Sequence, residues 1–291
     1  MMIPEKEKHV ILQGHASKEL RKVEGKSIRC CVTSPPYWGL RDYDHENQIG
    51  GEDSPEKFVQ NLVEVFSEVH RVLADDGTFW LNIGDSYASY RDSKMASQTM
   101  SKGNNRGMRT VGGANNRNPK VLKDAGIKHK ELCGIPWKVA FALQKFGWYL
   151  RQDIIWHKEN PMPESVKDRC TRSHEYLFLL TKKDKYYYNN EAIKELALDG
   201  TKKNKRDVWT TQTSKFRGGH FATFPKTLIE PCILAGSEEG DIILDPFNGS
   251  GTTGIVAMNN KRKYIGCDLN SVYIEIAEKR IASEVFKSTL F

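Results

Sequence analysis

The stretch DIILDPFNGSGTTG, residues 241–254, determines the fold class of this chain. Its first five residues form an apolar run that ends in an acid, Asp245, which is typical of a buried strand. A glycine-rich turn follows, and the apolar residues 255–258 then predict a helix. Glycines let the backbone approach a ligand closely, and a helix N-terminus offers unpaired N–H groups. The stretch therefore predicts a strand–turn–helix unit of an α/β fold, with a ligand site at the turn.

A second strand and helix follow this unit directly. Residues 263–268 form another strand that ends in an acid, Asp268, and residues 271–280 have helical apolar spacing. Asp268 lies 23 positions after Asp245 (268 − 245), close to the spacing at which an acid meets a ribose in dinucleotide folds. A dinucleotide site would require G-x-G-x-x-G, and an acid before the glycines would repel a diphosphate. The same acid suits a cationic sulfonium or amino group, so the pattern favours S-adenosylmethionine over NAD or FAD.

A proline-rich stretch near the N-terminus is the second candidate site. Residues 33–38, Thr-Ser-Pro-Pro-Tyr-Trp, follow an apolar strand at 28–32. The two prolines stop the strand and leave the carbonyls of Ser34 and Pro35 without ladder partners. A hydroxyl and free carbonyls then stand beside two aromatic faces. This combination predicts a binding site for a flat ring that carries an amino group. The alternative interpretation is a Pro-Pro turn capped by aromatic side chains of the core.

The remaining periodicity alternates helices with strands. Further strands are predicted at residues 10–16, 78–85, 148–156 and 175–181, and helices at 17–23, from 55 to a stop at 75–77, and at 135–143. Ser54 and Pro55 have the residue types of an N-cap and a first helical position. The order of elements fits one large α/β domain with inserts.

Composition limits the classes of function. The chain has 291 residues, of which 38% are hydrophobic, and a formal net charge of +7, which permits binding to nucleic acid. No apolar run reaches the roughly 20 residues of a membrane helix, and the charged N-terminus has no signal-peptide core. The cysteines form no C-x-x-C pair and the histidines no H-x-x-x-H pair. Reduced, structural thiols are therefore expected, and a metal site is not.

Two basic segments interrupt the pattern. Residues 86–130 carry ten Lys/Arg against two Asp, a net charge of +8 (10 − 2), with almost no apolar periodicity; order is expected to return at Leu132. Residues 201–219 hold six more Lys/Arg. A polar connection of this length is functional or unstructured. The charge favours phosphate binding by the first segment over a merely solvated loop.

Several of these stretches resemble one enzyme family. Residues 33–38 are similar to the catalytic motif of amino-DNA methyltransferases, and residues 245–253 to their cofactor motif. Residues 220–225, HFATFP, resemble the segment that precedes the cofactor strand and covers the methionine part of the cofactor. The catalytic motif comes first, which is the permuted order of the β-class enzymes. The resemblance covers most of the chain apart from the two basic segments.

The resemblance implies a Rossmann-like methyltransferase fold in a single domain, residues 1–291: a twisted, mainly parallel seven-stranded sheet with helices on both faces. It also implies methyl transfer from S-adenosylmethionine to the exocyclic amine of a base flipped out of duplex DNA. Ser34 Oγ and the Pro35 carbonyl would accept the protons of the amine, next to Pro36, and Tyr37 would stack on the base. One departure is that His15 and Ala16 follow Gly14 where the family often has Gly-Asp-Ala, so an acidic cofactor contact is expected to be absent there.

The resemblance and the charge pattern together imply a set of cofactor-binding residues and a set of DNA-contacting residues. The cofactor site would consist of Asp85, His220, Thr223, Phe224, Pro225, Asp245, Pro246, Phe247, Asn248, Gly249, Ser250, Gly251, Thr252, Thr253, Asp268 and Asn270. The DNA contacts would come from Arg106, Arg109 and Arg117 in the first basic segment and, as candidate target recognition, from Lys202, Lys203 and Arg206 in the second.

The identity of the methylated base stays open between two amines. Ser34 resembles the first motif position of N4-cytosine enzymes, whereas adenine enzymes more often carry Asp or Asn, so N4 of cytosine is favoured over N6 of adenine. Methylation at C5 of cytosine would need a cysteine nucleophile, and Cys232, after Pro231, lies in an apolar segment that predicts core packing.

Other classes of function remain as alternatives. Methyltransferases for RNA or protein amides resemble the unpermuted order, and a non-catalytic DNA-binding protein would not need both motifs. Duplex DNA is the expected partner, with a cognate restriction endonuclease as a further candidate, and neither a membrane nor a metal is expected. The expected location is the cytoplasm of a bacterium, for a bacterial or a phage-encoded protein, and the oligomeric state is open.

Overall fold

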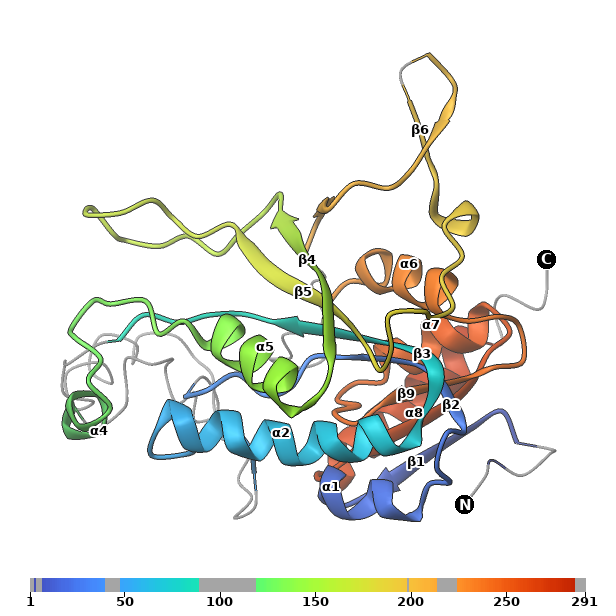
Figure 1. Ribbon diagram of the computed structural model, residues 1–291, viewed down its shortest axis with the longest axis horizontal. Helices are drawn as coiled ribbons and strands as arrows, with labels where there is room; N and C mark the ends of the chain where they lie inside the picture. The colour runs from blue at the N-terminus through green and yellow to red at the C-terminus, as the bar shows by residue number, and fades with distance from the viewer. Residues whose placement is uncertain are drawn as a thin grey trace.

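A computed structural model describes residues 3, 7–39, 48–88, 119–197, 199–213 and 224–285 (Figure 1). Its centre is one sheet of eight strands in the order β1-β10-β9-β2-β3-β5-β4-β8. The strands are β1 (His9–Gln13), β2 (Ile28–Thr33), β3 (Leu73–Ile83), β4 (Tyr149–Lys158), β5 (His174–Thr181), β8 (Val208–Thr211), β9 (Ile242–Asp245) and β10 (Lys263–Asp268). Only β5 runs antiparallel to its two neighbours, β3 and β4. The mainly parallel sheet is confirmed, with eight strands instead of seven, because β8 pairs with β4.

Helices cover both faces of this sheet. They are α1 (Ala16–Glu19), α2 (Pro55–Val72), α4 (Pro119–Asp124), α5 (Ile135–Phe146), α6 (Lys226–Gly236), α7 (Thr252–Asn259) and α8 (Ser271–Val285), with 3₁₀ turns η1 (Leu20–Lys22) and η3 (Glu191–Ile193). The helix predicted at Pro55 begins there, and Ser54 Oγ accepts a hydrogen bond from Lys57 N at 3.1 Å. The chain leaves α2 directly into β3, so the turn predicted at 75–77 lies inside the strand.

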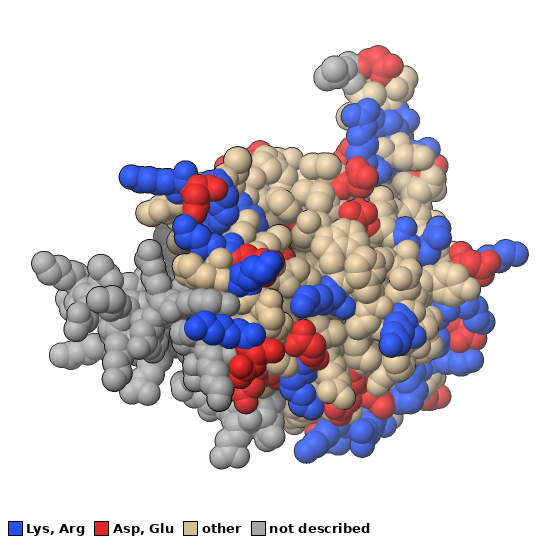
Figure 2. All heavy atoms as spheres, turned by 60° about the vertical axis from the view of Figure 1, so that its left-hand side comes forward, with Lys and Arg blue, Asp and Glu red and all other residues tan. Residues whose placement is uncertain are grey.

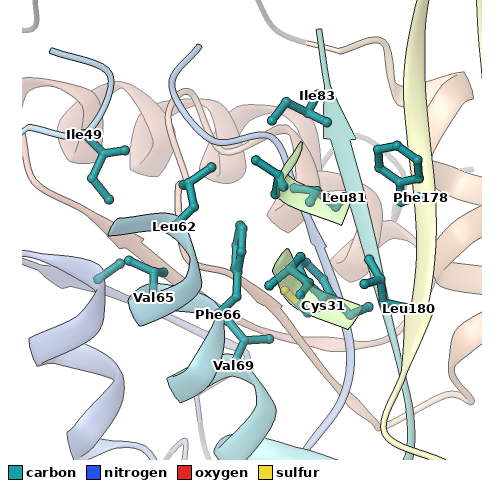
Figure 3. Close-up of a cluster of buried hydrophobic side chains, with 14 of the residues drawn as sticks. Cys31, Ile49, Leu62, Val65, Phe66, Val69, Leu81, Ile83, Phe178 and Leu180 are labelled. Carbon is teal, nitrogen blue, oxygen red and sulfur yellow. The ribbon is translucent and has the colours of Figure 1, made fainter. Parts of the chain in front are cut away.

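Alternation along the strands divides the core into two clusters. Cys31 on β2 and Leu81 on β3 lie in the first cluster with Phe66 of α2 (Figure 3). Phe66 also packs against Phe79 of β3, with ring centres 4.9 Å apart. Cys30 and Trp80 face α6 and α7 on the other side of the sheet. Successive strand residues point to opposite faces, so burial on both sides requires the nearly continuous apolar runs found in β2 and β3. The two clusters hold the strands rigidly and position the loops at their ends.

Parts of both basic segments, residues 86–130 and 201–219, form helix or strand in the structure. Arg106, Arg109 and Arg117 lie outside the described residues, but residues 119–130 include α4, and Leu122 and Ile127 are buried in the first cluster. The expectation that order returns only at Leu132 is therefore wrong, because these two apolar side chains dock on the core. In the second segment, β7 (Lys202–Lys203) pairs with β6 (Glu195–Leu196) in a ribbon that projects from the body (Figure 1).

Two further features concern the described residues alone. No helix in these ranges is long and apolar enough to cross a membrane. In the same ranges, no group of three or more His, Cys, Asp or Glu side chains could hold a metal ion.

Candidate active site

The predicted catalytic and cofactor stretches meet at one edge of the sheet. Asp268 ends β10, Asp245 ends β9, Ser34 follows β2, and Asp85 follows β3, and these strands are parallel neighbours in that order. Gly14, which follows β1, donates its N–H to the Asp268 carbonyl at 2.9 Å. In open α/β sheets the carboxyl ends of the strands are where ligands bind. The structure thus brings together residues from both ends of the sequence.

Asp245 joins the two motifs directly. Its carboxylate is 2% exposed and accepts hydrogen bonds from Thr33 Oγ1 at 2.5 Å and from Thr253 Oγ1 at 2.8 Å. The Phe247 N–H adds a third bond at 3.0 Å. Burial raises the pKa of Asp245 to about 6, although the hydroxyl donors oppose this rise. Asp245 therefore connects the end of β2 to the first turn of α7 through hydrogen bonds. Its charge lies beneath the glycine turn.

The glycine turn has the backbone geometry that its sequence predicts. Gly249 and Gly251 have φ values of +50° and +76°, a region that favours glycine. A side chain at Gly251 would also lie 2.9 Å from the Ala277 Cβ on α8. The Gly249 N–H donates to Asp268 Oδ2 at 2.8 Å, and Asn270 N donates to Oδ1 at 2.9 Å. The turn is thus closed against Asp268, which remains partly exposed at the edge of the sheet.

Three polar residues of the turn serve the fold instead of facing solvent. Asn248 is buried, and its Oδ1 accepts a bond from the Tyr264 hydroxyl at 2.7 Å. Arg280 Nη1 donates to both the carbonyl and the hydroxyl of Ser250 at 2.7 Å, and to Thr252 Oγ1 at 3.3 Å. These bonds satisfy polar groups that would be costly to bury unpaired. They fix the shape of the turn.

The other predicted cofactor residues take separate positions. Pro246 is buried, Phe247 is half-buried next to Phe66, and Phe224 packs in the second cluster immediately before Pro225, the N-cap of α6. His220 and Thr223 lie outside the described residues.

Asp85 caps a helix. Its carboxylate accepts hydrogen bonds from the N–H groups of Ser86, Gly134 and Ile135 at 2.8, 3.0 and 3.1 Å, and the last two lie at the start of α5. Burial nevertheless raises the pKa of Asp85. An acid at a helix N-terminus is stabilised by the unpaired N–H groups there. A direct cofactor contact by Asp85 stays a prediction.

The catalytic motif leaves the sheet where β2 ends at Thr33. Ser34, Pro36 and Tyr37 are half-buried, and Pro35 is buried. Trp38 is buried, and its Nε1 donates to the Glu52 carbonyl at 3.0 Å. Of the two aromatic side chains, only Tyr37 is therefore placed to meet a ligand, and Trp38 anchors the loop.

Sequence reasoning missed three residues that surround Tyr37. The Tyr37 hydroxyl donates to Glu175 Oε2 at 2.5 Å, Asn82 Nδ2 donates to the same oxygen at 3.3 Å, and Lys158 pairs with Glu175 Oε1. Burial, followed by the nearby Glu175 charge, raises the pKa of Tyr37 well above its ordinary value. The available signal was position alone: Asn82 lies in the predicted strand 78–85, Glu175 begins the predicted strand 175–181, and Lys158 follows the predicted strand 148–156 by two residues. Periodicity does not reveal which strand ends are neighbours.

The alternative of C5 methylation does not fit the position of Cys232. Its side chain is fully buried inside α6, and its Sγ donates to the Leu228 carbonyl at 3.7 Å. Burial raises the pKa of this thiol well above its usual range. Because the thiolate is the nucleophile, a buried thiol of high pKa is inert. The prediction that Cys232 packs in the core is confirmed.

The two raised carboxyl pKa values predict a pH dependence of stability. Burial raises the pKa of Asp245 and of Asp268 to about 6 each, against about 3.9 for Asp in an unfolded chain. The folded state therefore binds the proton more tightly. This contribution to stability is complete below about pH 4 and is lost as the pH rises through about 6.

We expect the free energy of unfolding to fall across that window by about 1.4 kcal/mol per pKa unit for each acid. Urea unfolding at several pH values measures this fall, and Asp268→Asn should reduce it. Asp75→Asn is the control, because hydrogen bonds from Lys26 and Lys183 lower the pKa of Asp75 and move its titration below the window. An unchanged profile in Asp268→Asn would contradict the assignment.

Comparison with known proteins agrees with this geometry. A family model described as DNA methylase, of the N6/N4 methyltransferase type, matches residues 28–279. The chain is 50% identical over 277 residues to the type II methyltransferase M.Cfr9I of Citrobacter freundii, covering 94% of this chain and 88% of that protein. It is 48% identical over 273 residues to the type II methyltransferase M.SmaI of Serratia marcescens, covering 93% and 90%.

Solved structures share the fold. The cytosine-N4-specific PvuII DNA methyltransferase superposes with a TM-score of 0.67 at 17% identity, covering 97% of this chain and 93% of that chain. A candidate DNA modification methylase from Thermus thermophilus, in complex with S-adenosyl-L-methionine, superposes with a TM-score of 0.63 at 24% identity, covering 95% and 96%. The resemblance inferred from residues 33–38 and 245–253 is thereby confirmed, and the chain belongs to the N6/N4 DNA methylase family.

Proposed function

We propose that this chain is a type II DNA methyltransferase that moves a methyl group from S-adenosylmethionine to the exocyclic amine of a flipped-out base, with N4 of cytosine favoured over N6 of adenine. The observation that carries the proposal is the Thr33–Asp245–Thr253 bridge. It joins the end of the catalytic strand to the first turn of the cofactor helix. Ser34 and Tyr37 are thus held next to the glycine turn, as transfer between two bound groups requires.

The residues present fit S-adenosylmethionine. The glycine backbone at 249 and 251 and the partly exposed Asp268 carboxylate suit a nucleoside, and the Asp245 charge beneath the turn suits a cation. When bound, the cofactor supplies an electrophilic methyl group. The predicted cofactor is therefore also the one that the donor set supports.

Ser34 and Tyr37 would act on the amine. Its lone pair is delocalised into the ring, which makes the nitrogen a poor nucleophile. Ser34 Oγ and the Pro35 carbonyl would accept hydrogen bonds from its N–H groups and disfavour that delocalisation. Tyr37 would stack on the base and so hold the amine nitrogen in the position that methyl transfer requires.

The preference for cytosine rests on Ser34. Ser at this position resembles the N4-cytosine enzymes, and one structural neighbour is described as cytosine-N4-specific. Because that neighbour is distant in sequence, N6 of adenine remains the second candidate. RNA and protein substrates are less supported, because the relatives named above are DNA methylases or type II methyltransferases.

Positive charge on the surface supports a nucleic acid substrate. Figure 2 shows Lys and Arg side chains along the projecting ribbon and on the body, and the formal net charge of the chain is +7. Lys and Arg side chains neutralise phosphates, which supplies much of the affinity of proteins for DNA. Duplex DNA is therefore the proposed partner.

Three cations of the second basic segment lie away from the candidate active site. Lys202, Lys203 and Arg206 precede β8, so the chain carrying them enters the sheet at the amino ends of the parallel strands, whereas the site lies at the carboxyl ends. Residues 214–219 of the same segment are outside the described ranges. We therefore propose phosphate contacts, remote from the target base, for these three cations. A cognate restriction endonuclease and a bacterial cytoplasmic location remain part of the proposal.

The direct test is methylation with labelled S-adenosylmethionine. We expect label in duplex DNA and none in RNA or in protein. Mass spectrometry of the nucleosides should then show N4-methylcytosine. N6-methyladenine would overturn the choice of base, and label confined to RNA or protein would overturn the proposed substrate.

A salt titration tests the first basic segment. Each phosphate contact contributes about −0.9 to the slope of log affinity against log salt. Replacing Arg106, Arg109 and Arg117 with alanine should make this slope shallower by up to roughly three units, with little change in stability or cofactor affinity.

The matched control replaces Lys183, Lys261 and Lys279, three exposed lysines that pair with acids, and should leave the slope unchanged. A loss confined to the cognate duplex would indicate base readout by the arginines. A wild-type slope in the first variant would show that the segment is a solvated loop.

A further inference from the structure

Side chains from four neighbouring strand ends meet at the carboxylate of Glu175. Tyr37 follows β2, Asn82 is on β3, Lys158 ends β4 and Glu175 is on β5. The shared acceptor is Glu175, whose side chain is only 12% exposed. We propose that Glu175 is a positioning residue for methyl transfer: through the Tyr37 hydroxyl, it holds the Tyr37 ring in the plane in which it stacks on the target base. This inference rests on the proposed function.

The carboxylate is itself held from two sides. Lys158 pairs with Oε1, and Asn82 Nδ2 donates to Oε2 at 3.3 Å and to the Tyr176 carbonyl at 3.1 Å. The Lys158 ammonium also lies 4.6 Å from the centre of the Trp156 ring. Glu175 therefore cannot follow Tyr37 if the ring tilts, and the hydroxyl is bound to a fixed point.

The acceptor of the Tyr37 hydroxyl is a carboxylate, although packing alone would not require a charged acceptor there. A half-buried phenol needs only one neutral acceptor, such as a backbone carbonyl. A buried carboxylate carries a desolvation cost that must be offset by a partner, here Lys158. The hydrogen bonds that a carboxylate accepts are, however, shorter and roughly twice as strong as those between neutral groups. The 2.5 Å bond from Tyr37 is of this kind. The arrangement thus restrains the ring more tightly than burial alone would.

Gly84 supplies the second restraint on the ring. A side chain there would lie 2.7 Å from Tyr37 Cε2, so the ring edge rests directly on the backbone that follows β3. The ring is thus in contact at two points, its hydroxyl with Glu175 and one edge with the backbone at Gly84. Tyr37 is still half-buried, so part of the ring remains accessible to a base.

The test combines Glu175→Gln with Tyr37→Phe. Gln keeps the shape but loses the charge, and we expect the single-turnover rate of DNA methylation to fall by about 10- to 100-fold, as misplacement of a reacting group does. Cofactor affinity should not change. In the Tyr37→Phe background, which has no hydroxyl to hold, Glu175→Gln should change the rate by less than about threefold. A merely structural Glu175 would instead cost as much in either background.

Fluorescence gives a second readout. In a duplex with 2-aminopurine at the target position, the complex of Glu175→Gln should emit more strongly than that of the unaltered protein, because a base that stacks less is quenched less. The control is Asp75→Asn, another ion-paired carboxylate, which contacts Lys26, Lys182 and Lys183 and not Tyr37. It should leave the rate and the emission unchanged.

The proposed function and the role of Glu175 fail on different results. If the unaltered protein does not methylate DNA, the proposed function fails. If it does, and Glu175→Gln matches it in rate or loses the same factor with Tyr37→Phe present, the positioning role is overturned.

Discussion

Replacing Tyr37 with alanine is expected to lower the single-turnover rate of methyl transfer by about 100-fold, because the base loses the surface that holds it. Ser34→Ala should cost about 100- to 1,000-fold, the range for removing one hydrogen-bonding group that acts in the transition state. Neither change should alter cofactor affinity, since neither side chain contacts Asp245 or the glycine turn through a hydrogen bond described here.

Rapid-quench assays with saturating cofactor would measure these rates, and calorimetry the cofactor affinity. Tyr37→Phe is the matched control, because it keeps the ring and loses only the hydroxyl, with its bonds to Glu175 and, at 3.4 Å, to Asn82 Oδ1. Its rate should lie between those of the unaltered protein and Tyr37→Ala. Rates equal to the unaltered protein in Ser34→Ala or Tyr37→Ala would remove that residue from the catalytic set.

Asp245→Ala should affect stability and cofactor binding together. Without the carboxylate, the hydroxyls of Thr33 and Thr253 lose their acceptor in a buried place. We expect the free energy of unfolding to fall by about 2–6 kcal/mol, at 1–3 kcal/mol for each of the two unmatched hydroxyls. The catalytic strand and the cofactor helix would then be less firmly joined.

Asp245→Asn separates charge from hydrogen bonding. Its amide oxygen can still accept one hydroxyl, so stability should remain within about 1 kcal/mol of the unaltered protein. S-adenosylmethionine should nevertheless bind about tenfold more weakly or worse, because the negative charge under the turn is gone. Denaturant unfolding and calorimetry measure the two quantities. Unchanged affinity in Asp245→Asn would show that Asp245 acts only as a connection between β2 and α7.

The sequence alone determined the local units of this protein. An apolar run that ends at Asp245, the glycines at 249 and 251, and the helix after them are recognisable because strand length, turn chemistry and helical spacing are properties of neighbouring residues. The proline-stopped strand before Tyr37 is of the same kind. Together with the order of the two motifs, these units were enough for the family and the fold class, which the comparisons confirm.

Only the tertiary structure decided which of these units touch. Glu175 lies 138 positions from Tyr37, and Asp245 lies 212 positions from Thr33, yet each pair is joined at 2.5 Å. Periodicity states which face of a strand is buried, but not which strand lies beside it. Asp85 shows the same limit: its position at a strand end suggested a ligand, whereas the fold brings the start of α5 to it. The eighth strand also depends on pairing with β4, since a strand of four residues, of which only Trp209 is buried, carries little signal alone.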